Sequence, residues 1–299
     1  MDCRICNSAL PTDPAFDGVL DYEHGIETHS RFFQCSHCGT LSLDADSAAL
    51  DPSSLYPVDY RPHSRSPLFL ALKRIQSELF LHALKRYLPS KDEPVLELGC
   101  GAGQLLLALR RRGFSRLFGA DRNRGAQADL SSNGIGFIQG ELATVLARPE
   151  KYACIILGYV LEHSDNPHHL LQQCRDALTE TGRVLVLTPS SESWSALFFG
   201  KYWAGLHAPR HIEIFTPRSL RLLGEKAGLH TKEQTLLLDP GSWAVSFQNF
   251  LRGRSGKKQN PGRGTAWVTY FALVFFFPLA LLEKISRRGS AILCVLQPA

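Results

Sequence analysis

The sequence predicts an α/β fold with a doubly wound, mostly parallel sheet, and three features of the chain support this. Short apolar runs bounded by glycine or proline recur between residues 94 and 187, each with the length of a buried strand. Segments of helical periodicity separate them, which is the alternation that a parallel sheet requires. The first run leads into a glycine turn and a leucine-rich segment, as expected where a strand meets a helix beside a ligand.

The predicted elements follow one another without a long gap. We expect strands at 94–98, 116–120, 135–138, 153–158, 183–187, 229–238 and 290–296. We expect one helix to begin at Ser66-Pro67 and another to begin after Gly103. Two further helices should span 168–178, with Gly182 as the terminator, and 218–227. The last strand should run antiparallel to its neighbours, which gives a seven-stranded sheet.

Composition sets broad limits on the protein. A chain of 299 residues suits one large domain with an appendage. With 44% apolar and 20% charged residues, the chain is globular and not disordered. The net charge of +5 permits an anionic partner but does not require one.

The glycine turn indicates which ligand the sheet would bind. Gly99, Gly101 and Gly103 are spaced so that the backbone can turn tightly against a ligand, but Gln104 stands where a dinucleotide fingerprint has its third glycine. Glu97 precedes the turn by two residues, and a carboxylate there disfavours a pyrophosphate and suits a cationic amine. S-adenosylmethionine carries an amine, a sulfonium and a ribose but no phosphate.

A second acid completes the predicted nucleoside site. Asp121 ends the apolar run 117–120, which should be the next parallel strand. A carboxylate at the carboxyl end of that strand is placed to accept hydrogen bonds from both ribose hydroxyls.

These residues resemble a known family. Glu97 to Gly103, then Asp121, then Leu161-Glu162-His163 resemble the signature of class I S-adenosylmethionine-dependent methyltransferases, over roughly residues 70–235 and the last strand. The resemblance implies a Rossmann-like sheet with S-adenosylmethionine as cofactor. It implies cofactor contacts from Glu97, Gly99, Cys100, Gly101, Gly103, Asp121, Arg122, Glu141, Leu142 and Tyr159. Glu141 has an equal alternative role at the positive end of the next helix.

Four of the eight cysteines are paired in a metal-binding pattern. Cys3 and Cys6, and Cys35 and Cys38, form two C-x-x-C knuckles typical of a zinc ribbon. The alternatives are two disulfides or four unrelated buried thiols. Four thiolates leave no open position, so the zinc would be structural. The N-terminus starts with this polar, metal-like motif and lacks a signal-peptide pattern, which predicts a reducing, cytoplasmic setting.

The composition changes along the chain predict five segments. They are a zinc-ribbon-like segment (1–45), a linker (46–66), the S-adenosylmethionine-binding core (67–238), a basic and apolar helical insertion (239–289) and the final core strand (290–299).

Three histidines are the candidate catalytic residues. His163 follows the fourth strand, where acceptor and methyl group meet in this fold; the alternative is a capping or supporting role. His207 and His211 flank Arg210 and either bind an anionic acceptor with it or hydrogen-bond their own loop. A base is needed only where the acceptor is a weak nucleophile such as a hydroxyl.

The insertion predicts an interaction surface. A basic segment (249–264) precedes the uncharged run 267–282, which is shorter than the roughly 20 residues that a membrane-spanning helix needs. We expect either peripheral contact through 249–288 with an anionic membrane, at its inner face, or burial in a hairpin or homodimer interface.

Three functions remain open from the sequence. The first is a methyltransferase for a small-molecule or for a lipid- or glycan-linked acceptor, by in-line methyl transfer. The second is an RNA methyltransferase, which the modest net charge disfavours. The third is a cofactor-binding or membrane-associated protein without catalysis.

Overall fold

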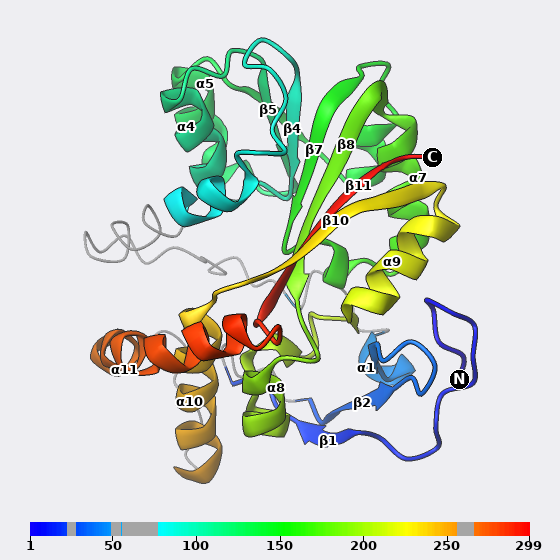
Figure 1. The fold of residues 1–299 in the computed structure, drawn as a ribbon, viewed down its shortest axis with the longest axis vertical. Coiled ribbons are helices and arrows are strands. Elements are labelled where there is room, and N and C mark those ends of the chain that lie inside the picture. Colours follow the sequence, from blue (N-terminus) through cyan, green and yellow to red (C-terminus); the bar gives the residue numbers. More distant parts are fainter. Residues whose placement is uncertain (23–27, 49–54, 56–76, 256–265) are drawn as a thin grey trace.

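A seven-stranded sheet forms the centre of the molecule (Figure 1). The computed structural model describes residues 1–22, 28–48, 55, 77–255 and 266–299. The strand order is β10-β11-β8-β7-β4-β5-β6. The strands are β4 (Val95–Leu98), β5 (Leu117–Asp121), β6 (Gly136–Gln139), β7 (Tyr152–Gly158), β8 (Leu178–Pro189), β10 (Leu229–Leu237) and β11 (Ala291–Pro298).

The directions of the strands agree with the predicted topology. β4 pairs in parallel with β5 and β7, and β6 and β8 extend this arrangement on the two sides. β11 pairs antiparallel with both β8 and β10, so the last strand of the chain lies between them. Both the seven strands and the antiparallel last strand are as predicted.

Helices cover both faces of this sheet (Figure 1). They are α4 (Gln104–Arg111), α5 (Gln127–Ser132), α6 (Leu142–Leu146), α7 (Pro167–Asp176) and α9 (Pro217–Lys226), with a further helix at 77–84. Along β7, Ile155 and Leu157 belong to one buried cluster, whereas Cys154 and Ile156 belong to another. Since neighbouring residues of a strand point to opposite faces, the sheet is doubly wound.

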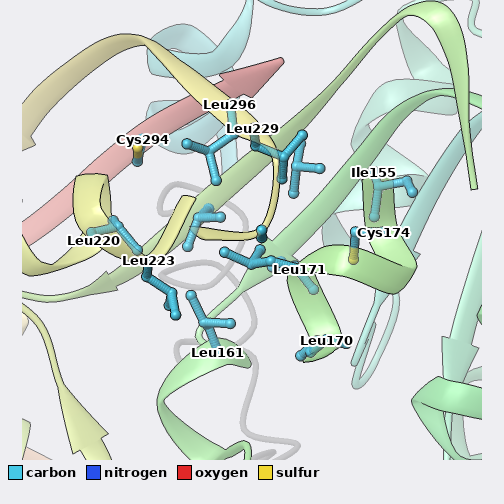
Figure 2. Close-up of a cluster of buried hydrophobic side chains, with 14 of the residues drawn as sticks. Ile155, Leu161, Leu170, Leu171, Cys174, Leu220, Leu223, Leu229, Cys294 and Leu296 are labelled. Carbon is cyan, nitrogen blue, oxygen red and sulfur yellow. The ribbon is translucent and has the colours of Figure 1, made fainter. Parts of the chain in front are cut away.

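The first of these clusters joins α7 and α9 to the sheet. Figure 2 shows Leu171 of α7, Leu223 of α9 and Leu296 of β11 among its members. The second cluster contains Leu106 of α4 and Leu130 of α5. These two layers hold the carboxyl ends of β4 and β5 in fixed positions.

One predicted boundary is wrong. We expected a helix over 168–178 that ends at Gly182, but α7 ends at Asp176 and Gly182 lies inside β8. An ideal Cβ on Gly182 would lie 2.9 Å from the Tyr152 carbonyl oxygen. The glycine therefore permits close approach of β8 to β7, where the register shifts, and does not terminate the helix.

A second, smaller sheet combines the N-terminus with the core. β1 (Phe16–Val19), β2 (Ser30–Gln34) and β3 (Leu41–Leu43) pair antiparallel in sequence order, and α1 (Ala45–Ala48) follows them. The fourth strand, β9 (Glu213–Ile214), comes from the part of the chain between β8 and α9 and pairs with β3.

Further contacts tie the two parts together. Thr216 donates a hydrogen bond to the Cys38 carbonyl, and Lys226 donates one to the Ile5 carbonyl. The five-segment division stays a prediction. The linker 46–66 and the start of the helix at Ser66 lie almost wholly outside the described residues.

The insertion is helical, as predicted. α10 (Pro240–Ser255) and α11 (Ala266–Ile285) lie within 239–289. Before the insertion, α8 (Trp194–Phe199) is followed by the 3₁₀ turns η3 (Gly200–Tyr202) and η4 (Ala204–Leu206). α10 and α11 pack against each other and lie together below the large sheet in Figure 1. Within the described parts of the chain, no helix has both the length and the apolar character needed to cross a membrane.

Candidate functional site

The glycine turn after β4 is built from three left-handed residues. Gly99, Gly101 and Gly103 have φ values of 66°, 52° and 70°, a region that residues with a Cβ enter at a cost. An ideal Cβ on Gly103 would lie 2.6 Å from Leu130 Cδ2 of α5, so this glycine is needed for packing. An ideal Cβ on Gly101 would meet no atom within 4 Å, so the turn leaves an open cradle at that position.

Asp121 holds this turn against the end of β5. Its carboxylate accepts hydrogen bonds from the backbone N–H of Gly101 at 2.9 Å and from that of Asn123 at 2.8 Å. The turn and the acid are therefore positioned by each other. Asn123 in turn caps the 3₁₀ turn η1 (Arg124–Ala126), which fixes the chain beyond the acid.

Glu97 lies beside Asp121 and is buried. β4 and β5 pair with Glu97 opposite Gly119, so the two acids lie toward the same edge of the sheet. Burial first, and the nearby Asp121 charge second, raise the pKa of Glu97 to about 8. Its Oε2 has no hydrogen-bond partner among the described residues. A buried carboxylate with an unsatisfied oxygen suits a ligand that brings a cationic donor.

These features fit S-adenosylmethionine. Glu97 offers an unsatisfied acceptor for the ammonium group, and Asp121 retains acceptor capacity for ribose hydroxyls. The cradle at Gly101 offers room for close approach to the backbone. Cys100 lies within the same turn, where burial raises the pKa of its thiol. It therefore stays a neutral wall of the turn at physiological pH.

The other predicted cofactor contacts include residues that follow β5 and β6, which pair beside Asp121. Arg122 pairs with Glu141, with its Nε 2.8 Å from Glu141 Oε2, and both side chains are exposed. Leu142 begins α6 and is partly buried against the core. Glu141 precedes α6 without capping it through its side chain, so its carboxylate is occupied by Arg122 and not by the helix.

Tyr159 sits in the loop after β7 with a left-handed φ of 58°. Its ring packs against that of Phe80, with ring centroids 6.2 Å apart. Burial raises the pKa of its hydroxyl well above 10, so it is neutral. An ideal Cβ on Gly99 would lie 2.6 Å from Val160 Cγ2, which shows that this loop abuts the glycine turn.

The three predicted histidines lie together at the end of this loop. His163 belongs to the 3₁₀ turn η2 (Leu161–His163), and its ring centroid is 4.6 Å from that of His211 and 6.3 Å from that of His207. The His207 and His211 centroids are 4.9 Å apart. The structure thus brings together residues that are 44 and 48 positions apart in the sequence.

Backbone carbonyls fix the protonation of two of these rings. His163 Nδ1 lies 3.0 Å from the Arg210 carbonyl oxygen, and His211 Nδ1 lies 2.7 Å from the Gly205 carbonyl oxygen. A carbonyl only accepts, so each Nδ1 carries the proton and each Nε2 has a lone pair in the neutral ring. Burial lowers the pKa of His163 to about 3 and that of His211 well below 6.5.

Glu162 is the site residue to which the sequence assigned no role. Its side chain is fully buried, its carbonyl accepts a hydrogen bond from Ile212 N, and burial raises the pKa of its carboxyl to about 8. Its Oε1 lies 4.0 Å from His211 Nε2. Potential ligand atoms of Glu162, His163 and His211 lie within 4.8 Å of one another and could together hold a metal ion. The only sequence signal was an acid directly before a histidine in an apolar segment.

Arg210 has a different role from the anion binding that we considered. Its guanidinium is buried, and it donates hydrogen bonds to the Leu55 carbonyl at 3.0 Å and to Asp21 Oδ2 at 2.9 Å. The arginine therefore anchors the histidine-bearing segment to the N-terminal part of the chain.

The four paired cysteines form a second candidate site. Their sulfur atoms lie within 4.8 Å of one another, with 3.5 Å between Cys3 and Cys38 and 3.4 Å between Cys6 and Cys35. All eight cysteines are free thiols, so the disulfide alternative does not apply. Tetrahedral zinc places thiolates about 3.8 Å apart, so the residues fit this ion.

Comparisons with known proteins agree with the fold and show the family of the chain. Residues 72–234, more than half of the chain, match the methyltransferase domain family, and the protein belongs to that family. A ubiquinone biosynthesis O-methyltransferase of Cereibacter sphaeroides is 27% identical over 173 residues, which cover 54% of this chain and 70% of the relative. One of Dinoroseobacter shibae is 26% identical over 178 residues, covering 54% and 71%. The chain is an S-adenosylmethionine-dependent methyltransferase.

Solved structures share the architecture at low sequence identity. A protein of Haloferax volcanii, solved in complex with the Trm112 methyltransferase activator, aligns over 77% of this chain and 93% of its own. It is 19% identical, with a TM-score of 0.53. An S-adenosylmethionine-dependent methyltransferase of Archaeoglobus fulgidus covers 77% and 99%, at 17% identity and a TM-score of 0.50. These likenesses concern the fold.

Proposed function

We propose that this protein transfers a methyl group from S-adenosylmethionine to a hydroxyl oxygen of a small-molecule or lipid-linked acceptor. The single observation that carries the proposal is the cluster of neutral, carbonyl-oriented histidines, of which His163 follows three residues after Val160, the residue that abuts Gly99. Similar proteins named as ubiquinone biosynthesis O-methyltransferases support an oxygen acceptor, although they match only 54% of this chain.

The cofactor side would be served by the residues of the first site. Glu97 would accept the ammonium group of the methionine part, and Asp121 would accept the ribose hydroxyls. The adenine of S-adenosylmethionine would lie beside the residues that follow β5 and β6, namely Arg122, Glu141 and Leu142. The donor supplies a methyl group that is already activated, so the protein's main task is to orient it and to exclude water.

The histidine cluster would serve the acceptor. A hydroxyl that receives a methyl group as a cation must lose its proton, and a neutral imidazole Nε2 can take it. His163 is the base that we favour, because it is closest in sequence to the loop that abuts the glycine turn. His207 and His211 would orient the acceptor and hold His163 in place.

The four cysteines would hold a structural zinc ion. Four thiolates would fill all four coordination positions of the zinc ion, so none would remain for a substrate. The ion would stabilise the N-terminal sheet, whose strand β3 pairs with β9 only two residues beyond His211. Zinc would thus support the acceptor side through the backbone. Zinc-bound thiolates also favour a reducing, cytoplasmic setting.

A labelling experiment tests the proposal. The protein is incubated with methyl-labelled S-adenosylmethionine and a total cell extract, and label is measured in lipid, small-molecule and RNA fractions. We expect label in the lipid or small-molecule fraction, in a product that is heavier by one methylene unit. His163→Ala should lower kcat about a hundredfold or more. His230→Ala, which removes an exposed histidine, should not.

Two other outcomes would contradict the proposal. Label in RNA, with binding that weakens steeply as salt rises, would favour an RNA methyltransferase. Bound S-adenosylmethionine without label in any fraction would favour a cofactor-binding protein that lacks catalysis.

A further inference from the structure

Helices α8 and α11 together present an apolar surface to solvent, which we call the apolar face. Among its members, Val274 is 77% exposed, Phe198 is 74% exposed and Ile285 is 69% exposed. The apolar face comprises Leu197, Phe198, Val274, Phe275, Phe277, Leu279, Leu281, Leu282 and Ile285. Single exposed apolar residues are common on soluble proteins, but nine of them on two adjacent helices mark an interaction site.

The side of α11 opposite the apolar face packs against the rest of the protein. The helix is therefore already seated by its buried side, and the apolar face is a separate surface. Phe276 is buried and stacks on Trp243 of α10 with ring centroids 5.6 Å apart. Ala280, one turn further on, is fully buried. Between residues 274 and 285, the helix therefore packs one face against α10 and exposes the opposite face to solvent.

The only acid of α11 points away from the apolar face. Glu283 is 1% exposed, and its carboxylate accepts hydrogen bonds from Ser195 N at 2.9 Å and from Trp243 Nε1 at 3.0 Å. The Ser290 hydroxyl also lies within 2.5 Å of this carboxylate. Glu283 thus fixes α11 against α8 and α10, and leaves no exposed carboxylate in these helices.

Cations border the apolar face. Lys284 is exposed in the last turn of α11, and Arg287 and Arg288 are exposed directly after this helix. Exposed apolar side chains with a rim of Lys and Arg are the pattern of a surface that lies on an anionic bilayer.

The same charges argue against a second copy of the chain as the partner. In a symmetric dimer each surface faces its own equivalent, so the cationic rims would approach each other. Like charges across an interface are unfavourable. An anionic lipid surface has the opposite charge and an apolar interior, and it complements both the rim and the apolar face.

The apolar face is coupled to the histidine cluster through α10. Ser246 of α10 accepts a hydrogen bond from Ala204 N of η4 at 2.8 Å, and Trp203 donates one to Ser242 Oγ at 3.2 Å. η4 leads directly into His207. A surface bound to this face would therefore lie near the segment that carries His207 and His211.

We propose that the α8–α11 apolar face docks this protein on anionic lipid bilayers and thereby presents its acceptor side to lipid-linked substrates. The docking stands on the exposed side chains and the charges alone, and only the second half rests on the proposed function. Binding would be peripheral, with the aromatic and aliphatic side chains at the level of the lipid headgroups.

Vesicle cosedimentation with the full-length protein tests the docking. The probes are vesicles of phosphatidylcholine alone and of phosphatidylcholine with phosphatidylglycerol. We expect binding to the anionic vesicles and at least about tenfold weaker binding to the neutral ones. The double variant Phe198→Ser and Phe275→Ser should lose about tenfold or more in affinity for anionic vesicles.

A matched control separates docking from general hydrophobicity. Leu79 is 65% exposed but lies on the helix 77–84, outside the apolar face. Leu79→Ser should bind anionic vesicles as the wild type does. Arg287→Gln with Arg288→Gln should weaken binding to anionic vesicles about tenfold and make it less sensitive to salt.

Several outcomes would overturn the proposal. One is that the wild type and the double variant of Phe198 and Phe275 bind anionic vesicles with equal affinity. Another is a vesicle-free dimer, detected by light scattering, that the double variant abolishes; this would assign the face to a second copy. S-adenosylmethionine binding is measured on every variant. If the wild type binds vesicles but does not bind S-adenosylmethionine, the proposed function is contradicted and the docking is not.

Discussion

Arg210 and Asp21 form a buried ion pair between the histidine-bearing segment and the N-terminal part of the chain. Arg210 Nη2 lies 2.9 Å from Asp21 Oδ2, and both side chains are almost fully buried although the residues are 189 positions apart. The Arg210 carbonyl also accepts the Nδ1 proton of His163. One residue thus joins the N-terminal segment to the candidate base.

Removing the acid of this pair should destabilise the protein. Asp21→Asn removes the carboxylate charge that pairs with the buried Arg210 guanidinium, and we expect a loss of about 3–5 kcal/mol in the free energy of unfolding. Urea denaturation measures it. Asp46→Asn removes the partner of Arg31 in an exposed pair and should change stability little. A similar small change for Asp21→Asn would show that the pair does not anchor the segment.

The cradle at Gly101 should be needed for the cofactor and not for folding. Gly101→Ala has room for its Cβ in the protein, so folding should lose only about 1–2 kcal/mol from the left-handed φ. The added methyl group would fill the cradle and abolish cofactor binding. Gly18→Ala is the matched control, because Gly18 has a φ of 62° and open space but lies in β1. It should bind S-adenosylmethionine normally, as isothermal titration calorimetry would measure.

Cofactor binding should release a proton from Glu97. Burial and Asp121 raise its pKa to about 8, so the free site is mostly protonated at pH 7. The ammonium group favours the ionised carboxylate, and the Kd should therefore fall by up to about tenfold per unit as the pH rises from about 6 to 8. Calorimetry in buffers of different ionisation enthalpy counts the released protons. Glu97→Gln should bind more weakly, without this proton release; equal release from both proteins would place the titrating group elsewhere.

Loss of one knuckle cysteine should remove a metal ion. Cys38→Ala should lower the zinc content of the purified protein by about one equivalent and expose the N-terminal sheet to protease, because metal binding and folding of this segment are coupled. Cys174→Ala removes another buried thiol, in α7, and should keep the ion. Elemental analysis compares the two variants. Unchanged zinc in Cys38→Ala would contradict the assignment.

The central sheet could be predicted because its signals are local. Each strand is a short apolar run with a breaker beside it, and the glycine turn and Asp121 mark the carboxyl edge of the sheet. The histidines could be proposed as candidates from their positions after the fourth and fifth strands. Their contact with one another depends on the loop 204–211 folding back, which no local pattern states.

Long-range contacts account for what was missed. β9 is two residues long and exists only because β3, from the N-terminus, pairs with it. Asp21 gives no sequence signal of its pairing with Arg210, and Gly182 resembles a helix terminator although it permits strand packing. The burial of Glu283 follows from α8 and α10 offering donors to it, which helical periodicity alone does not show.

Equilibrium binding of labelled S-adenosylmethionine tests the central claim most directly. The claim predicts saturable binding of one molecule per chain to the folded wild type. Asp121→Ala, which removes the acceptor for the ribose and for Gly101 N, should weaken this binding about tenfold to a hundredfold while thermal unfolding shows that it remains folded. Absence of saturable binding to the wild type, or equal binding by the two proteins, would contradict the account.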